Sequence, residues 1–230
     1  ARVLRMDFDT TRTKDSYEKI LQAFASQEAD ILIGTQMIVK GHDFPNVTLV
    51  GVLAADMSLH VADYHAAERT FQLLTQAVGR AGRGQLPGQA VIQTYDPEHF
   101  AIQTAKAQDY ESFYQHEIAY RKMMHYPPIW NMLLVHCMGK NEQITQQTAQ
   151  LMADKLQSAI KRSNRPVLLV GPADATIAKV NDIYRKVLYR KAADYQTLVA
   201  LKDALEQFGK KTNAFSNVTI QFDFNPSSGF

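Results

Sequence analysis

The chain has 230 residues, 46% hydrophobic and 21% charged, a composition typical of soluble globular proteins rather than disordered or fibrous ones. Its net charge is +2, and its single cysteine, Cys137, excludes an internal disulfide and any zinc site built from several thiolates. No apolar run has the length of a membrane span and no signal-peptide pattern is present, so we expect a cytoplasmic protein without membrane contact. Because the chain opens at Ala1 with a strand-like segment, we also expect it to be a piece of a longer protein.

Strand-like and helix-like patterns alternate over the first part of the chain. Strands are predicted at 1–6, 30–34, 46–53 and 89–95, and helices at 13–27 and 64–82. The short, wholly apolar runs are typical of strands that are buried on both faces of a parallel sheet. The alternation therefore predicts an α/β layer with a parallel sheet.

The second part of the chain shows a different order of elements. Residues 98–125 predict one or two helices, and the prolines of Tyr126-Pro127-Pro128 then impose an extended break. Beyond the break we predict strands at 130–138, 166–171, 183–191 and 217–224, and helices at 142–162 and 194–208. This β-α-β-β-α-β order predicts a ferredoxin-like α+β domain, similar to a ribosomal-protein-S10-type domain. The predicted divisions are 1–106, a helical linker at 107–126, and 127–230.

One helical stretch gathers an amide and two guanidinium groups. Gln76, Arg80 and Arg83 are spaced i, i+4 and i+7, which places them on nearly the same face of a helix. Guanidinium groups bind phosphate oxygens in a bidentate manner, so the pattern favours a phosphate site. Gly79 and Gly82 leave the backbone bare for a large anion or a neighbouring domain. A solvated arginine pair at a glycine-broken helix end is an equally simple alternative.

Polar residues also follow the predicted buried strands, where ligands bind in parallel sheets. Thr35 follows the strand at 30–34, and Lys40, Gly41 and Asp43 lie in the connection to the next strand. The turn at Thr35 offers a hydroxyl and backbone amides to a phosphate. Asp43, like Asp56 after the second strand, suits a ribose, a metal-bound water or a helix cap, and capping is favoured for either one alone.

Basic and aromatic residues interleave on the predicted strand 183–191. Tyr184 and Arg185 belong to this run, whose composition suits single-stranded nucleic acid through stacking and phosphate contacts. Strand alternation divides the run between two faces, so a half-exposed strand with packed tyrosines is as good an interpretation. The histidines show no metal-ligand spacing, and we predict no metal site within this chain.

Two segments resemble helicase motifs. Residues 34–50, GTQMIVKGHDFPNVTLV, resemble motif V of superfamily 2 helicases, and residues 72–84, QLLTQAVGRAGRG, resemble motif VI. The wording of both is similar to the primosomal protein N′ family, the PriA-type replication-restart DNA helicases. The segments 62–69, ADYHAAER, and 121–128, RKMMHYPP, extend the resemblance, although Ala62 and His65 stand where the family has Pro and Arg.

The resemblance implies a RecA-like second helicase lobe followed by a C-terminal domain. No phosphate-binding Walker A loop and no acidic Walker B box occur, so a missing first lobe would bind ATP and Mg²⁺, and this piece alone would not hydrolyse ATP. Zinc is expected only in the absent part of the parent. The implied catalytic residues are Gln76, Arg80 and Arg83. The implied nucleotide contacts are Gly41, Asp43, Arg80 and Arg83, and the implied DNA contacts are Thr35 and Lys40, joined by Tyr184 and Arg185.

The implied function is that of an ATP-dependent DNA helicase that restarts stalled replication forks and helps assemble the primosome. Its expected partners are forked and single-stranded DNA, single-strand-binding protein and primosome proteins, and it is expected to be a monomer. An RNA helicase or duplex translocase is a related alternative. A non-catalytic module that binds nucleic acid or protein is an alternative from a different class.

Overall fold

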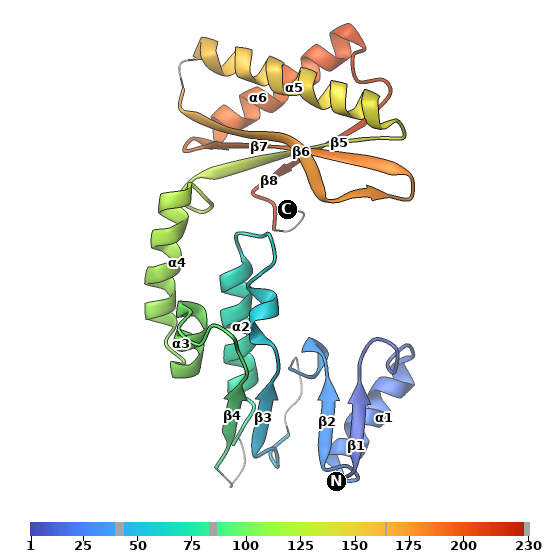
Figure 1. The fold of residues 1–230 in the computed structure, drawn as a ribbon, viewed down its shortest axis with the longest axis vertical. Helices are drawn as coiled ribbons and strands as arrows, with labels where there is room; N and C mark the ends of the chain where they lie inside the picture. The colour runs from blue at the N-terminus through green and yellow to red at the C-terminus, as the bar shows by residue number, and fades with distance from the viewer. Residues whose placement is uncertain (40–43, 83–86, 164, 228–230) are drawn as a thin grey trace. The chain divides into compact units, whose positions relative to one another are not determined.

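The chain folds into two compact units. The structure, a computed structural model, describes residues 1–39, 44–82, 87–163 and 165–227 (Figure 1). The lobe unit comprises Ala1–Val61 and Ala66–Tyr114, and the C-terminal unit comprises Ala62–His65 and Gln115–Phe230. Helix α4 (Tyr110–Met124) runs across this division. Among the described helices, none is long and apolar enough to cross a membrane.

The lobe unit is built from parallel strands and helices. Its elements are β1 (Val3–Met6), α1 (Lys14–Ala25), β2 (Ile31–Gly34), the 3₁₀ helix η1 (Gln36–Val39), β3 (Leu49–Val52), the 3₁₀ helix η2 (Ala55–Ser58), α2 (Ala66–Val78), β4 (Gln89–Ile92) and α3 (Phe100–Ala107). Strand β1 pairs with β2 and β3 pairs with β4, both in parallel. The predicted α/β layer with parallel pairing is confirmed.

Helix α2 owes its position to an apolar face. Ala66, Thr70, Phe71, Leu74 and Ala77 recur at helical spacing and are all buried. Phe71 stacks on Phe113 with ring centroids 4.2 Å apart, and the cluster continues into α3 through Ala101, Ile102 and Ala105. The opposite, polar face of α2 is therefore left for solvent or a ligand.

The C-terminal unit is a four-stranded antiparallel sheet covered on one face by two helices (Figure 1). Its elements are β5 (Asn131–Gly139), α5 (Glu142–Ser163), β6 (Val167–Val180), β7 (Ile183–Ala192), α6 (Tyr195–Thr212) and β8 (Thr219–Phe224). The strand order β6-β7-β5-β8 is that of a ferredoxin-like fold, which confirms the prediction from the sequence. Leu133, Val135 and Leu188 of the sheet pack with Leu156 of α5 and Leu198 of α6.

The predicted end of strand β6 was wrong. The sequence analysis placed this strand at 166–171, yet β6 continues through Pro172 to Val180. The strand lies at the edge of the sheet, and its register with β7 shifts between Val170 and Ala173. Proline is tolerated at edge strands and bulges because the ladder there does not need its missing N–H.

Candidate functional site

The polar face of α2 lies opposite η1 and η2. Exposed side chains of Arg69, Gln72 and Gln76 repeat along this face, and η1 packs against the same helix. η2 is joined to α2 by a hydrogen bond between hydroxyls, because Thr70 Oγ1 donates to Ser58 Oγ at 2.7 Å. Ser58 Oγ in turn donates to Ala55 O at 3.0 Å. These contacts fix the three elements around a common hollow.

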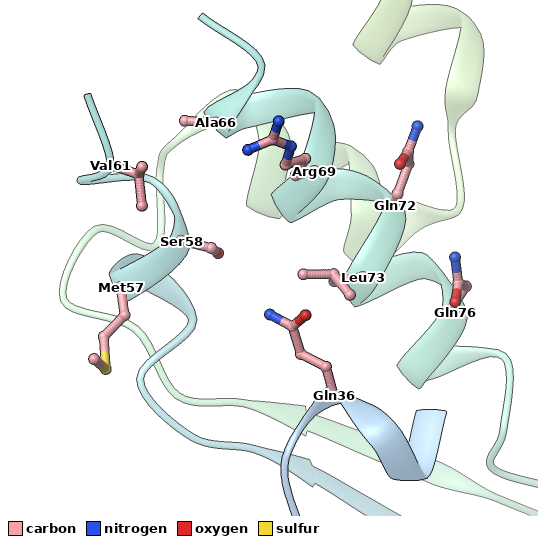
Figure 2. A pocket seen from close by; sticks show the side chains of 9 residues that line it. All are labelled: Gln36, Met57, Ser58, Val61, Ala66, Arg69, Gln72, Leu73 and Gln76. Carbon is pink, nitrogen blue, oxygen red and sulfur yellow. The ribbon is translucent and has the colours of Figure 1, made fainter. Parts of the chain in front are cut away.

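That hollow is a pocket of about 550 Å³ within the lobe unit. Its polar lining consists of Gln36, Ser58, Arg69, Gln72 and Gln76 (Figure 2). Its apolar lining consists of Met57, Val61, Ala66 and Leu73. Figure 2 shows the side chain of Gln36 rising from η1 toward α2, which carries the arginine and the two other glutamines. A pocket of this size falls within the range of about 300–1,000 Å³ that is usual for small-ligand sites.

The structure brings some of the predicted site residues to this pocket. Gln76 lines it, and exposed Thr35 directly precedes the lining residue Gln36. Arg80 is half-buried in the turn that follows α2, with its backbone N–H donating to Ala77 O at 3.0 Å. The other predicted residues of the lobe lie outside the described residues; they are Lys40, Gly41, Asp43 and Arg83.

The glycine after this turn has a structural role. Gly82 adopts a left-handed backbone with φ of 73°, and a Cβ there would clash with the backbone of Gly88. Its N–H donates to Val47 O at 3.0 Å, which ties the turn to the segment before β3. The close approach at Gly82 is thus made by this chain's own backbone, and the turn that carries Arg80 is held in place by it.

Asp56 serves as an anchor between loops and not as the helix cap that the sequence favoured, because it lies inside η2, whose N-cap residue is Ala54. Asp56 is 5% exposed, and it accepts hydrogen bonds from Tyr95 N at 2.8 Å, from Asp96 N at 3.3 Å and from the Thr94 hydroxyl. The Thr94 and Tyr95 hydrogen bonds hold the pKa of Asp56 below its ordinary value. Asp56 therefore joins the end of β3 to the end of β4, and it does not line the pocket.

Most of the basic residues of β7 turn out to be internal. Lys186 is 8% exposed and donates to Asp174 Oδ1 at 2.6 Å. Lys191 donates to Met124 O at 3.0 Å, and Arg190, 1% exposed, donates to Val170 O at 3.1 Å. Burial lowers the pKa of Arg190 to about 10. These three cations are buried and hydrogen-bonded within the C-terminal unit, so they are not exposed on a nucleic-acid surface.

The two predicted DNA contacts of β7 are half-buried. Tyr184 lies under Lys179, whose Nζ is 4.9 Å from the ring centroid. Arg185 points to the opposite face of the sheet, as strand alternation requires. The structure therefore separates Tyr184 from Arg185, and neither lies in the lobe pocket.

Sequence reasoning missed four polar residues that line the pocket, namely Gln36, Ser58, Arg69 and Gln72. Gln36 lies in the segment that resembles motif V, and Arg69 ends the family-like segment 62–69, which precedes the segment that resembles motif VI. A signal existed for Arg69, because Arg69, Gln72, Gln76 and Arg80 are spaced three to four residues apart along one stripe of the helix and its end. Nothing in the local pattern could reveal Gln36, because its place depends on how η1 packs against α2.

The donor set of the pocket suits an anion. One guanidinium and three carboxamides provide N–H groups, and no carboxylate is found among the described residues of the lining. Within the described parts of the chain, no group of three or more His, Cys, Asp or Glu side chains could hold a metal ion. The lining residues therefore offer hydrogen bonding and charge stabilisation to an anion.

Comparison with known families accounts for both units. Residues 2–85 match the family described as helicase conserved C-terminal domain, and residues 122–227 match the one described as primosomal protein N C-terminal domain. Both segments that resemble helicase motifs V and VI fall within the first match.

Curated relatives align with nearly the whole chain. The replication restart protein PriA of Bacillus subtilis is 46% identical over 98% of this chain and 28% of the relative. The Synechocystis PriA is 40% identical over 99% of this chain and 26% of the relative. The Chlamydia muridarum PriA is 39% identical over 94% of this chain and 27% of the relative. The chain thus spans about a quarter of the length of the curated relatives it matches.

Proposed function

Because the chain belongs to the replication restart protein PriA family, we propose that it is the C-terminal part of an ATP-dependent DNA helicase that restarts stalled forks and helps assemble the primosome. The observation that carries the proposal is the pairing of a helicase C-terminal lobe with a PriA-type C-terminal domain in one chain. The name of the curated relatives supports the same assignment.

In this proposal the lobe unit completes a nucleotide site whose other half lies elsewhere in the parent protein. Arg80 and Arg83 contact the γ-phosphate of ATP, where negative charge develops during transfer. Gln76 orients the γ-phosphate or the attacking water, and Gly41 and Asp43 line the nucleotide side. ATP and Mg²⁺ are held mainly by the first lobe, zinc is confined to the rest of the parent, and this piece alone does not hydrolyse ATP.

The DNA strand is held by other residues of this chain. Thr35 and Lys40 contact the phosphate backbone beside the nucleotide site, while Tyr184 and Arg185 provide contacts in the C-terminal unit. Alternate closing and opening of the two lobes during ATP turnover then moves the grip along the DNA. Single-strand-binding protein and primosome proteins are the proposed partners of a monomeric, cytoplasmic motor.

The proposal is tested by DNA-stimulated ATP hydrolysis of the full-length protein with Arg83→Ala. An arginine that stabilises the transferring phosphoryl group contributes about 10³–10⁵ in rate, so we expect turnover to fall by at least two orders of magnitude while binding to forked DNA stays nearly unchanged. Arg12→Ala is a matched control, because Arg12 lies in the same unit with a side chain that is 71% exposed.

Two results would contradict this assignment. Undiminished turnover in Arg83→Ala would mean that the arginine has a structural or DNA-gripping role. Absence of DNA-stimulated hydrolysis in the unaltered full-length protein would instead select the alternative, a non-catalytic module that binds nucleic acid or protein.

A further inference from the structure

The lobe pocket has the properties of a phosphate-binding site that includes a cation outside the helicase motifs. Arg69 lies in α2 before the motif VI segment, and it lines the pocket with Gln36, Gln72 and Gln76. Its guanidinium presents five N–H donors in a planar fork that matches two oxygens of a phosphate.

The other polar residues of the pocket lining also suit a phosphate group. Each glutamine offers an NH₂ group with two donors, so the polar wall can supply hydrogen bonds on several sides of one oxyanion. Gln72 uses one donor on Glu68 Oε1 at 3.3 Å, and Glu68 itself is not part of the lining. Among the lining residues that the structure describes, the pocket therefore carries one positive charge, several neutral donors and no anionic side chain.

The pocket adjoins both the proposed DNA contact and the proposed γ-phosphate contact of this lobe. Gln36 follows Thr35, the proposed contact to the DNA backbone, without an intervening residue. Gln76, the proposed γ-phosphate contact, lies seven residues after Arg69 and therefore two turns along the same face of α2. Seven residues correspond to about 10 Å along the helix, so a phosphate at Arg69 and a γ-phosphate at Gln76 would occupy separate positions on one face of α2.

We propose that this pocket binds a phosphate group and that Arg69 is its principal anchor. The inference rests on the proposed function, because the two available sources of such a group are the DNA backbone and ATP. The position of Gln36 beside Thr35 favours a backbone phosphate of the DNA strand.

The test uses the full-length protein with Arg69→Gln, Arg69→Lys and the control Arg12→Gln. Affinity for a fluorescent single strand is measured without nucleotide at several salt concentrations, and affinity for a non-hydrolysable ATP analogue is measured without DNA. If the DNA backbone fills the pocket, Arg69→Gln weakens DNA binding on the order of tenfold at low salt. It also reduces the steepness of the slope of log K against log salt by about 0.7. Arg69→Lys keeps the positive charge, and therefore the salt dependence, but loses the planar fork of donors. Its affinity for DNA should lie between that of Arg69→Gln and that of the unaltered protein.

Each outcome has a definite meaning. A loss confined to the ATP analogue also supports a phosphate site and identifies ATP as the source of the group. Unchanged affinity for both ligands in Arg69→Gln, with a thermal transition equal to that of Arg12→Gln, would overturn the proposal. Hydrolysis by the unaltered protein is measured separately, so a failure of the motor function is distinguishable from a failure of this pocket.

Discussion

At the scale of single residues, the described polar side chains divide into anchors within the chain and exposed groups that line the pocket. Asp56 was open to both interpretations in the sequence, and its three donors within the chain make it an anchor. Cys137 is likewise structural, since it is fully buried and burial raises the pKa of its thiol to about 12. Arg69 and Gln76 are on an exposed face of α2, and both line the lobe pocket.

The anchor role of Asp56 predicts a pH-dependent loss of stability in Asp56→Asn. The folded-state pKa of Asp56 is lowered, so its contribution is present above the ordinary pKa of about 3.9 and is lost as pH falls through the folded value. We expect Asp56→Asn to lower the melting temperature at pH 7, and the difference from the unaltered chain to shrink toward pH 3. Circular dichroism melting at both pH values measures this, with Asp9→Asn as control because the Asp9 side chain is 67% exposed. An equal deficit at both pH values would mean that the charge of Asp56 is irrelevant.

At the scale of elements, a short segment from the first half of the chain packs in the C-terminal unit. Residues 62–65 belong to that unit although the segments on both sides of them belong to the lobe unit. Tyr64 is 8% exposed, its hydroxyl donates to Pro226 O at 3.1 Å, and its ring stacks on Tyr126 with centroids 4.9 Å apart. The guanidinium of Arg121 lies 5.3 Å from the same ring.

Removing the Tyr64 ring should therefore destabilise the C-terminal unit. Truncation of a buried aromatic side chain to alanine costs about 3–5 kcal/mol, whereas loss of the hydroxyl alone costs about 0.5–1.5 kcal/mol. We expect Tyr64→Ala to unfold at distinctly lower urea than Tyr64→Phe. Trp130, the single tryptophan of the chain, lies in this unit and provides the fluorescence signal. Equal midpoints for the two variants would show that the ring contacts add nothing.

At the scale of the whole molecule, the two units have separate cores. The C-terminal core is formed by apolar side chains from the range 133–224. The lobe core is formed by Val52, Ala55, Phe71 and Phe113 together with the buried residues of α3. The larger core unites four antiparallel strands with two long helices, which is enough apolar contact for independent folding.

We expect residues 110–230 to fold without the lobe unit. This piece keeps α4 and the entire core of the sheet but lacks Tyr64, so it should melt cooperatively at a temperature below that of the complete chain. Thermal unfolding followed by Trp130 fluorescence measures this. A gradual, non-cooperative change would contradict the independence of the C-terminal unit.

The sequence by itself determined the two fold types, the motif-like segments and the helix that presents Gln76. These features depend on local periodicity, on the order of elements and on side-chain spacing within one helix, all of which are visible along the chain. The tertiary structure decided which distant residues meet. It placed Gln36 in a pocket with Arg69, continued β6 past Pro172 because the strand is at an edge, and buried Arg190 against Val170 O. Such outcomes depend on packing between segments far apart in the chain, for which a single sequence carries no periodic signal.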